Sequence, residues 1–269
     1  MQETGNKNLV GTDRLTIRVG QNSLTFAFDR GEGSGTVVVP YIINAGISMA
    51  ANLREALRSE VLRGKKWDKA LVMLDSPHIL VPIDEYKEQN KETMFRYTMT
   101  DQENNAVLST VLPSLNAVAI YALNKDLKLV LTDNFKDIKI RPVCGPVWQY
   151  LQRRSMAGNA EKLYCYFHDA KVEIFSFRKN RFRFANTFPA TSPADTVYFI
   201  MATWQQLTMN GQKDEIYLVG KPKEADRITD DLRRFVENVF WVKPSADFNR
   251  HPLTLQEGVP FDMIAMLLG

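Results

Sequence analysis

The chain has 269 residues, 45% of them hydrophobic and 24% charged, and its 34 basic and 31 acidic residues leave a net charge of only +3. These proportions exclude a disordered chain, and the small net charge argues against a surface built throughout to hold nucleic acid. The length fits one large domain or two of roughly 130 residues. Neither a secretory leader nor a run of 18 apolar residues is found, so we expect a cytoplasmic protein without a membrane span.

The first third of the chain reads as three strands followed by a helix. Residues 1–14 are polar and are expected to form a flexible arm. Apolar alternation then predicts strands, and a 3.6-residue period predicts a helix. The strands are expected over residues 15–19, 23–29 and 36–43, and the helix over 47–63. Pro40 places the third strand at a sheet edge or a bulge, because proline cannot donate to a ladder.

The middle of the chain contains an apparent insertion. Two short apolar strands and a polar helix are expected first, at residues 69–74, 78–83 and 84–93. Inserted strands then occupy about 95–123, as pieces over 97–100, 106–112 and 117–123. A helix over 125–134, a strand over 138–143 and a helix over 146–154 follow. The polar stretch 155–159 is the predicted domain boundary.

The three-strand pattern then recurs. Strands are expected over residues 163–167, 172–177 and 181–187, a helix from Pro193, a strand over 215–219, a helix over 224–239, a short strand over 240–242 and a last apolar helix from Pro260. The recurrence predicts a duplicated α/β protein, with a first half over 15–156 and a second over 157–269.

This twice-repeated order of meander, helix, strand, helix and strand resembles the actin-like ATPase fold of sugar kinases, heat-shock chaperone ATPases and actin. The chain is also similar to an uncharacterised domain-of-unknown-function family typical of Bacteroidetes, whose members resemble actin-like proteins of pilus assembly and cell division. The resemblance covers about Leu15 to Leu268. It implies a duplicated actin-like ATPase (ribonuclease H-like) fold, with a mixed β-sheet flanked by helices in each half.

The resemblance also places a nucleotide site. In active members of the fold, a hairpin in each half holds the phosphates and metal with glycine and a carboxylate, and a glycine pair before a late helix holds the adenosine. The matching positions are Gly20 and Ser23 in the first hairpin, Asp169 in the second, and Gly220. The first hairpin lacks a carboxylate, the second lacks a glycine, and Pro222 removes a donor. The loops are therefore expected to be degenerate, with ATP and Mg²⁺ as the alternative.

The histidines and cysteines do not predict a metal site. His78, His168 and His251 are far apart in the chain. Cys165 and His168 are three residues apart on a predicted strand, so their side chains point to opposite faces. Cys144 and Cys165 lie in apolar segments, which is typical of buried reduced thiols.

The basic segment 178–183 has two interpretations. Its cations alternate with aromatic rings, as in a platform for single-stranded RNA. On a strand, however, Arg181 and Arg183 share one face while Phe182 and Phe184 share the other, which makes a solvated face and a core face. We favour the second interpretation, and nucleic acid is not an expected partner.

No reaction can be identified from these residues. We expect an uncharacterised actin-like protein that acts as a non-catalytic interaction or regulatory module with a protein partner. The alternatives are an ATP-binding or ATP-hydrolysing switch or enzyme that uses Gly20, Ser23, Asp169 and Gly220, and an RNA-associated factor that uses residues 178–183.

Overall fold

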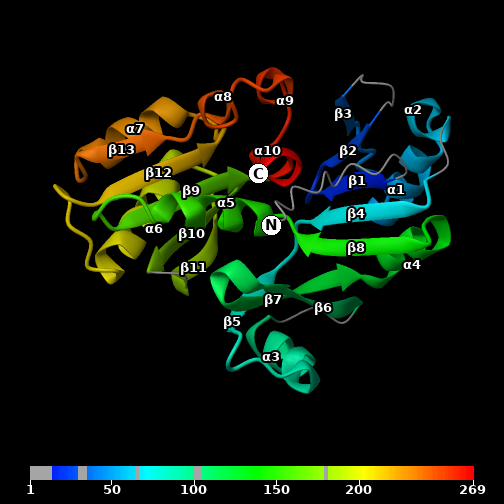
Figure 1. Ribbon diagram of the computed structural model, residues 1–269, viewed down its shortest axis with the longest axis horizontal. Coiled ribbons are helices and arrows are strands. Elements are labelled where there is room, and N and C mark those ends of the chain that lie inside the picture. Colours follow the sequence, from blue (N-terminus) through cyan, green and yellow to red (C-terminus); the bar gives the residue numbers. More distant parts are fainter. Residues whose placement is uncertain (1–13, 30–34, 65–66, 100–103, 179–180) are drawn as a thin grey trace, which may run out of the picture.

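The computed structural model describes residues 14–29, 35–64, 67–99, 104–178 and 181–269. Its strands form two larger sheets side by side, with a smaller sheet below the first (Figure 1). The predicted arm therefore lies, except for Arg14, outside the described residues.

The first sheet has the strand order β3-β2-β1-β4-β8 among the described residues. Its strands are β1 (Arg14–Val19), β2 (Leu24–Asp29), β3 (Thr36–Tyr41), β4 (Lys69–Leu74) and β8 (Asp137–Pro142). β1 pairs antiparallel with β2 and parallel with β4, so the sheet is mixed. β3 lies at the edge, as the proline at position 40 predicted.

Helices α1 (Met49–Leu57), α2 (Glu60–Arg63) and α4 (Lys125–Asn134) belong to the first half. α1 begins where the Ser48 hydroxyl accepts a hydrogen bond from the Ala51 amide, and α4 begins where the Asn124 side chain accepts from two amides. These caps satisfy backbone donors that the first turn leaves free. α1 and α4 pack against each other.

The second sheet repeats the first in its order, β11-β10-β9-β12-β13. Its strands and helices are β9 (Lys162–His168), β10 (Lys171–Arg178), β11 (Arg181–Pro189), α6 (Pro193–Gln206), β12 (Glu215–Gly220), α7 (Ala225–Arg233) and β13 (Asn238–Trp241). In both sheets the strand that comes first in the chain lies at the centre, antiparallel to the second and parallel to the fourth. The predicted duplicated α/β architecture is confirmed.

The helix predicted over 224–239 is too long. α7 ends at Arg233, and Asn238 already pairs with Glu215 in the sheet. Val239 is 3% exposed and packs in the core as a strand residue, whereas Phe235, four residues earlier and therefore on the same face of a continuous helix, is 61% exposed. The need for a last parallel strand beside β12 overrides the helical spacing of the apolar residues.

The insertion contains a helix where a strand was predicted. Its elements are β5 (His78–Pro82), η1 (Glu88–Asn90), α3 (Lys91–Thr98), β6 (Asn105–Leu112), η2 (Pro113–Leu115) and β7 (Ala117–Asn124), with the sheet order β5-β7-β6. The strand predicted over 97–100 is wrong, because residues 91–98 are helical and residue 100 lies outside the described residues. The polar helix predicted over 84–93 is correspondingly shifted toward the C-terminus.

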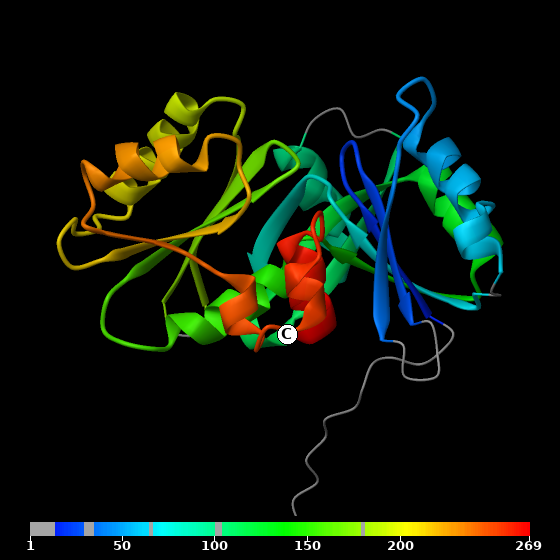
Figure 2. The ribbon, with the colours of Figure 1, turned by 90° about the horizontal axis from the view of Figure 1, so that it is seen from above.

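Helices from two parts of the chain lie between the two sheets. They are α5 (Gly145–Ser155) and, from the C-terminal part, α8 (Pro244–Asp247), α9 (Pro252–Leu255) and the predicted last helix, α10 (Phe261–Leu268). α5 and α10 pack against each other, and α10 lies between the halves when the molecule is seen from above (Figure 2). The predicted boundary at 155–159 begins at the last residue of α5 and ends before β9.

One hydrophobic core runs through both halves. It joins side chains of the first sheet, such as Ile17 and Val72, to Tyr164 and Phe175 of the second, and to Met263 of α10. The outer face of the second sheet has a separate core under α6 and α7, and the insertion has a third. Across the described residues, the helices are all too short or too polar to cross a membrane.

Candidate functional site

The two predicted phosphate hairpins meet in space. The amide of Gly20 donates to the carbonyl of Ser23 at 2.8 Å and closes the first hairpin. In the second hairpin, Asp169 and Ala170 have φ values of 42° and 58°, which make the tight turn between β9 and β10. The Ser23 hydroxyl donates to Asp169 Oδ1 at 3.1 Å. A hydrogen bond thus joins residues from opposite halves of the chain.

A buried arginine, which the sequence interpretation missed, connects these hairpins. Arg18, near the end of β1, places its Nη2 atom 2.7 Å from Asp169 Oδ2 and donates through Nη1 to the Ser23 hydroxyl at 3.1 Å. Its Nε lies 2.9 Å from both oxygens of Asp262 in α10. The Tyr166 hydroxyl donates to Asp262 at 2.6 Å. This Arg18 network joins the first sheet, the second sheet and the last helix.

The Arg18 network is almost free of solvent. Side-chain exposure is 3% for Arg18, 10% for Asp169 and 0% for Asp262. Burial by itself would raise the pKa of Asp169, but the hydrogen bond from His168 and the charge of Arg18 outweigh it and hold this pKa well below its usual range. Burial lowers the pKa of Arg18, and Asp262 and Asp169 more than offset that effect. The Arg18 guanidinium and the Asp169 carboxylate are therefore charged at neutral pH.

The two predicted site glycines are required by contacts within the protein. A Cβ on Gly20 would lie 2.2 Å from Ser23 Oγ and 2.6 Å from Asp169 Oδ1. Gly220 has φ +98°, and a Cβ there would lie 2.4 Å from the carbonyl oxygen of Phe167. Close approach of backbone and side chains therefore accounts for glycine at both positions.

A cavity of about 500 Å³ lies beside the Arg18 network. Ser23, Asp169 and Gly220 line it, whereas Gly20 lies behind Ser23. Its wall also includes Lys221, Lys243 and residues of the segment that leads through residues 254–261 into α10. The four residues predicted from the resemblance are thus brought to one place, where the C-terminal segment covers them.

The basic segment lies elsewhere, and its described cations are paired. Arg178 and Arg183 both contact Glu161, and Arg181 contacts Asp84. The Phe182 ring packs on Trp148 and Phe177 and is therefore part of the core. Residues 179 and 180 lie outside the described residues.

One signal in the sequence could have identified the Arg18 network. Asp262 is a single charge in the apolar segment Phe261–Leu268, and a buried carboxylate requires a partner. Nothing in the sequence specified Arg18 as that partner, since 244 residues separate the two. Arg18 alternates with apolar residues on β1, a pattern that reads equally well as a solvated strand face.

Known proteins share this architecture. Residues 4–239 match the family model described as "Protein of unknown function (DUF3822)". A crystal structure from Bacteroides thetaiotaomicron, described as a protein with actin-like ATPase fold and unknown function, is 21% identical over 96% of both chains with a TM-score of 0.84. A chain of the PilM–PilN type IV pilus biogenesis complex is 12% identical over 95% of this chain and 97% of its own, with a TM-score of 0.58. A search of curated proteins finds no match. This chain belongs to the DUF3822 family and has the actin-like ATPase fold.

Proposed function

We propose that this protein is a non-catalytic actin-like module that binds another protein and has no working Mg²⁺-nucleotide site. The observation that carries the proposal is that both carboxylate oxygens of Asp169 already accept hydrogen bonds from the protein. Oδ2 accepts one from the Arg18 guanidinium at 2.7 Å and lies 3.3 Å from His168 Nδ1, and Oδ1 accepts one from the Ser23 hydroxyl at 3.1 Å. A carboxylate that orders Mg²⁺-bound water needs those same oxygens.

Two further features support the proposal. The Ser23 hydroxyl is directed at Asp169, so it is not free for a phosphate. The fixed guanidinium of Arg18 already neutralises the carboxylate that would attract the metal ion. A chain of the same fold occurs in a complex named for two proteins, PilM and PilN, which supports protein binding as the role of this chain.

The ATP-binding switch is the second candidate, because the cavity of about 500 Å³ is lined by three of the four predicted residues and has Lys221 and Lys243 in its wall. Lysine side chains suit a phosphate group. No such observation favours the RNA-associated factor, since the described cations of the basic segment contact carboxylates.

Thermal unfolding with Mg²⁺-ATP separates the two candidates. At about 1 mM nucleotide, a Kd of about 10 µM would stabilise the fold by about 2.7 kcal/mol and raise the melting temperature clearly. We expect no rise and no release of phosphate. A rise that is lost in Asp169→Asn but kept in the surface variant Asp68→Asn would refute the proposal and establish the switch.

The binding role has its own test. We expect the full chain to co-purify with a protein in a fixed ratio, and nucleotide to have no effect on that ratio. A chain that binds a partner only with Mg²⁺-ATP would again favour the switch.

A further inference from the structure

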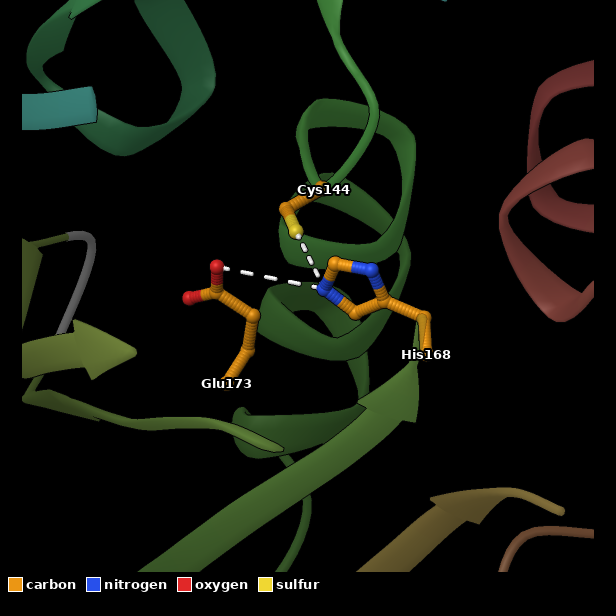
Figure 3. Close-up of side chains that lie close together, drawn as sticks. All are labelled: Cys144, His168 and Glu173. Carbon is orange, nitrogen blue, oxygen red and sulfur yellow. Dashed lines mark hydrogen bonds and ion pairs between the residues drawn. The ribbon is translucent and has the colours of Figure 1, made fainter. Parts of the chain in front are cut away.

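A second buried polar cluster lies behind the hairpins, and the proposed function uses only the Nδ1 atom of one member, His168. Cys144 at the start of α5, His168 at the end of β9 and Glu173 on β10 turn their side chains toward one another (Figure 3). One ligand atom from each lies within 4.8 Å of the other two. All three residues are buried, Glu173 with 1% exposure.

The sheet register explains how the cluster assembles. Glu173 pairs with Tyr166 across β9 and β10, so Glu173, Tyr166 and His168 project from the same face of the sheet. Cys165 projects from the opposite face, into the core under α6. The thiol that meets His168 comes instead from Cys144, in the other half of the chain.

The carboxylate of Glu173 lacks adequate compensation for its burial. Its Oε1 accepts a hydrogen bond from the Thr187 hydroxyl at 2.7 Å. The same oxygen lies 3.7 Å from His78 Nε2 and 4.0 Å from His168 Nε2. Its Oε2 is buried and has no hydrogen-bond partner among the described residues. In the described part of the chain, no lysine or arginine lies within 4.0 Å of it. A buried carboxylate in this condition is costly unless a cation compensates it.

Both imidazoles are oriented as metal ligands. His168 Nδ1 lies 3.3 Å from Asp169 Oδ2, and His78 Nδ1 lies 3.2 Å from the carbonyl oxygen of Ser76. An oxygen beside Nδ1 favours the tautomer with its proton there, which leaves the Nε2 lone pair free for a metal. In each of the two histidines, Nε2 is the ring nitrogen that lies nearer to Glu173.

We propose that Cys144, His168 and Glu173 form a structural Zn²⁺ site. His78 lies outside this group of three, with its Nε2 3.7 Å from Glu173 Oε1, and completes the site as the fourth ligand by a shift toward the ion. The Cys144 Sγ to His168 Nε2 distance is 3.5 Å. Two ligands of a tetrahedral zinc ion, with Zn–S of about 2.3 Å and Zn–N of about 2.0 Å, lie ~3.5 Å apart. Thiolate with imidazole and carboxylate is a donor set that suits zinc. One thiolate and one carboxylate balance its charge, so the occupied site would be neutral.

A neighbouring group, Asp75 with His168 and Asp169, is a poorer site. Lys171 Nζ lies 2.8 Å from Asp75, and Arg18 lies 2.7 Å from Asp169. Both carboxylates already have a cation. The charge that lacks compensation is on Glu173, and the zinc site is assigned there.

The test uses cobalt, which reports a thiolate ligand by an intense charge-transfer absorption in the near ultraviolet. The full chain is purified without metal-chelating resin, its metal content is measured, and the chain is then stripped and titrated with Co²⁺ without nucleotide. We expect about one ion per chain, since the ligands complete a single tetrahedral site. The band should be absent in Cys144→Ala and kept in Cys165→Ala, which removes an equally buried thiol outside the cluster.

Two more variants test the site without removing the thiol. Glu173→Gln should weaken Co²⁺ binding at least tenfold. His78→Gln should keep the charge-transfer band and change the visible bands that report coordination geometry. A wild-type chain without the band, or an unchanged band in Cys144→Ala, would overturn the proposal and leave a hydrogen-bonded cluster without a metal ion. Wild-type and Cys165→Ala spectra decide the question even if Cys144→Ala does not fold.

Discussion

At the scale of single residues, Arg18 illustrates why a buried charge must be read with its partners. The guanidinium is 3% exposed and is held by carboxylates from two other elements, Asp169 and Asp262. A buried ion pair adds little net stability compared with a well-packed apolar pair, but the loss of one partner leaves a charge without compensation. A substitution that removes one partner therefore lowers the free energy of unfolding by much more than the intact pair contributes to it.

Asp262→Asn should lower the free energy of unfolding by about 3–5 kcal/mol, because Arg18 would lose one of its two carboxylates while it stays buried. The matched control is Asp68→Asn. Asp68 is 45% exposed and pairs with Lys136, which is 76% exposed, so its loss should cost less than about 1 kcal/mol. Urea unfolding of the three proteins gives both values, and equal values would contradict the importance assigned to Asp262.

Gly20→Ala should cost about 1–3 kcal/mol, because the added methyl group would force Ser23 and Asp169 apart. Gly64→Ala is the control, since a Cβ at Gly64 meets nothing within 4 Å. The comparison is again made by urea unfolding. If Gly20→Ala were as stable as Gly64→Ala, the close contact between the two hairpins would be wrong.

At the scale of elements, α3 shows how a local pattern can mislead. Residues 97–100 contain an aromatic and two β-branched side chains, and this composition predicts a strand there. In the structure Phe95 is fully buried and Tyr97 is 91% exposed. Residues two apart share a face on a strand but lie on opposite faces of a helix, so burial distinguishes the two assignments.

This difference gives a direct test of α3. Phe95→Ala should destabilise the protein by about 3–5 kcal/mol, whereas Tyr97→Ala should change the free energy of unfolding by less than about 0.5 kcal/mol. Thermal or urea unfolding measures both. Similar large losses at the two positions would support the strand assignment.

At the scale of the whole molecule, the shared core makes the two halves dependent on each other. Side chains of both sheets and of α10 belong to one hydrophobic cluster. The Arg18 network also connects the two halves and α10. Separation of the halves would expose that apolar surface and leave buried charges unpaired. The halves are therefore expected to unfold together rather than in sequence.

Native-state hydrogen exchange tests this cooperativity. Amides of the interior strands β4 and β12 should exchange with the same free energy of opening, equal to that of global unfolding. Asp262→Asn should lower both values equally, because the Arg18 network lies between the halves. Exchange of β12 at a distinctly lower free energy than β4 would show that the second half opens alone.

The sequence by itself determined the duplicated α/β fold. Apolar alternation located the three strands of each meander, Pro40 placed β3 at an edge, and the apolar run after Pro260 specified the last helix. These features are local, since periods of 2 and 3.6 residues and the chemistry of proline act within a few neighbours. Gly20, Ser23, Asp169 and Gly220 came from a family resemblance, and they do gather at one place.

Only the tertiary structure decided what surrounds those residues. Arg18 lies 151 residues from Asp169 and 244 from Asp262, and Cys144 lies 24 from His168. Residue spacing correctly separated Cys165 from His168, but it could not bring Cys144 to the same imidazole. Each of these contacts depends on how two sheets and a helix pack, and packing is set by the whole core rather than by any local pattern. The Arg18 network and the Cys144–His168–Glu173 cluster are therefore properties of the folded molecule.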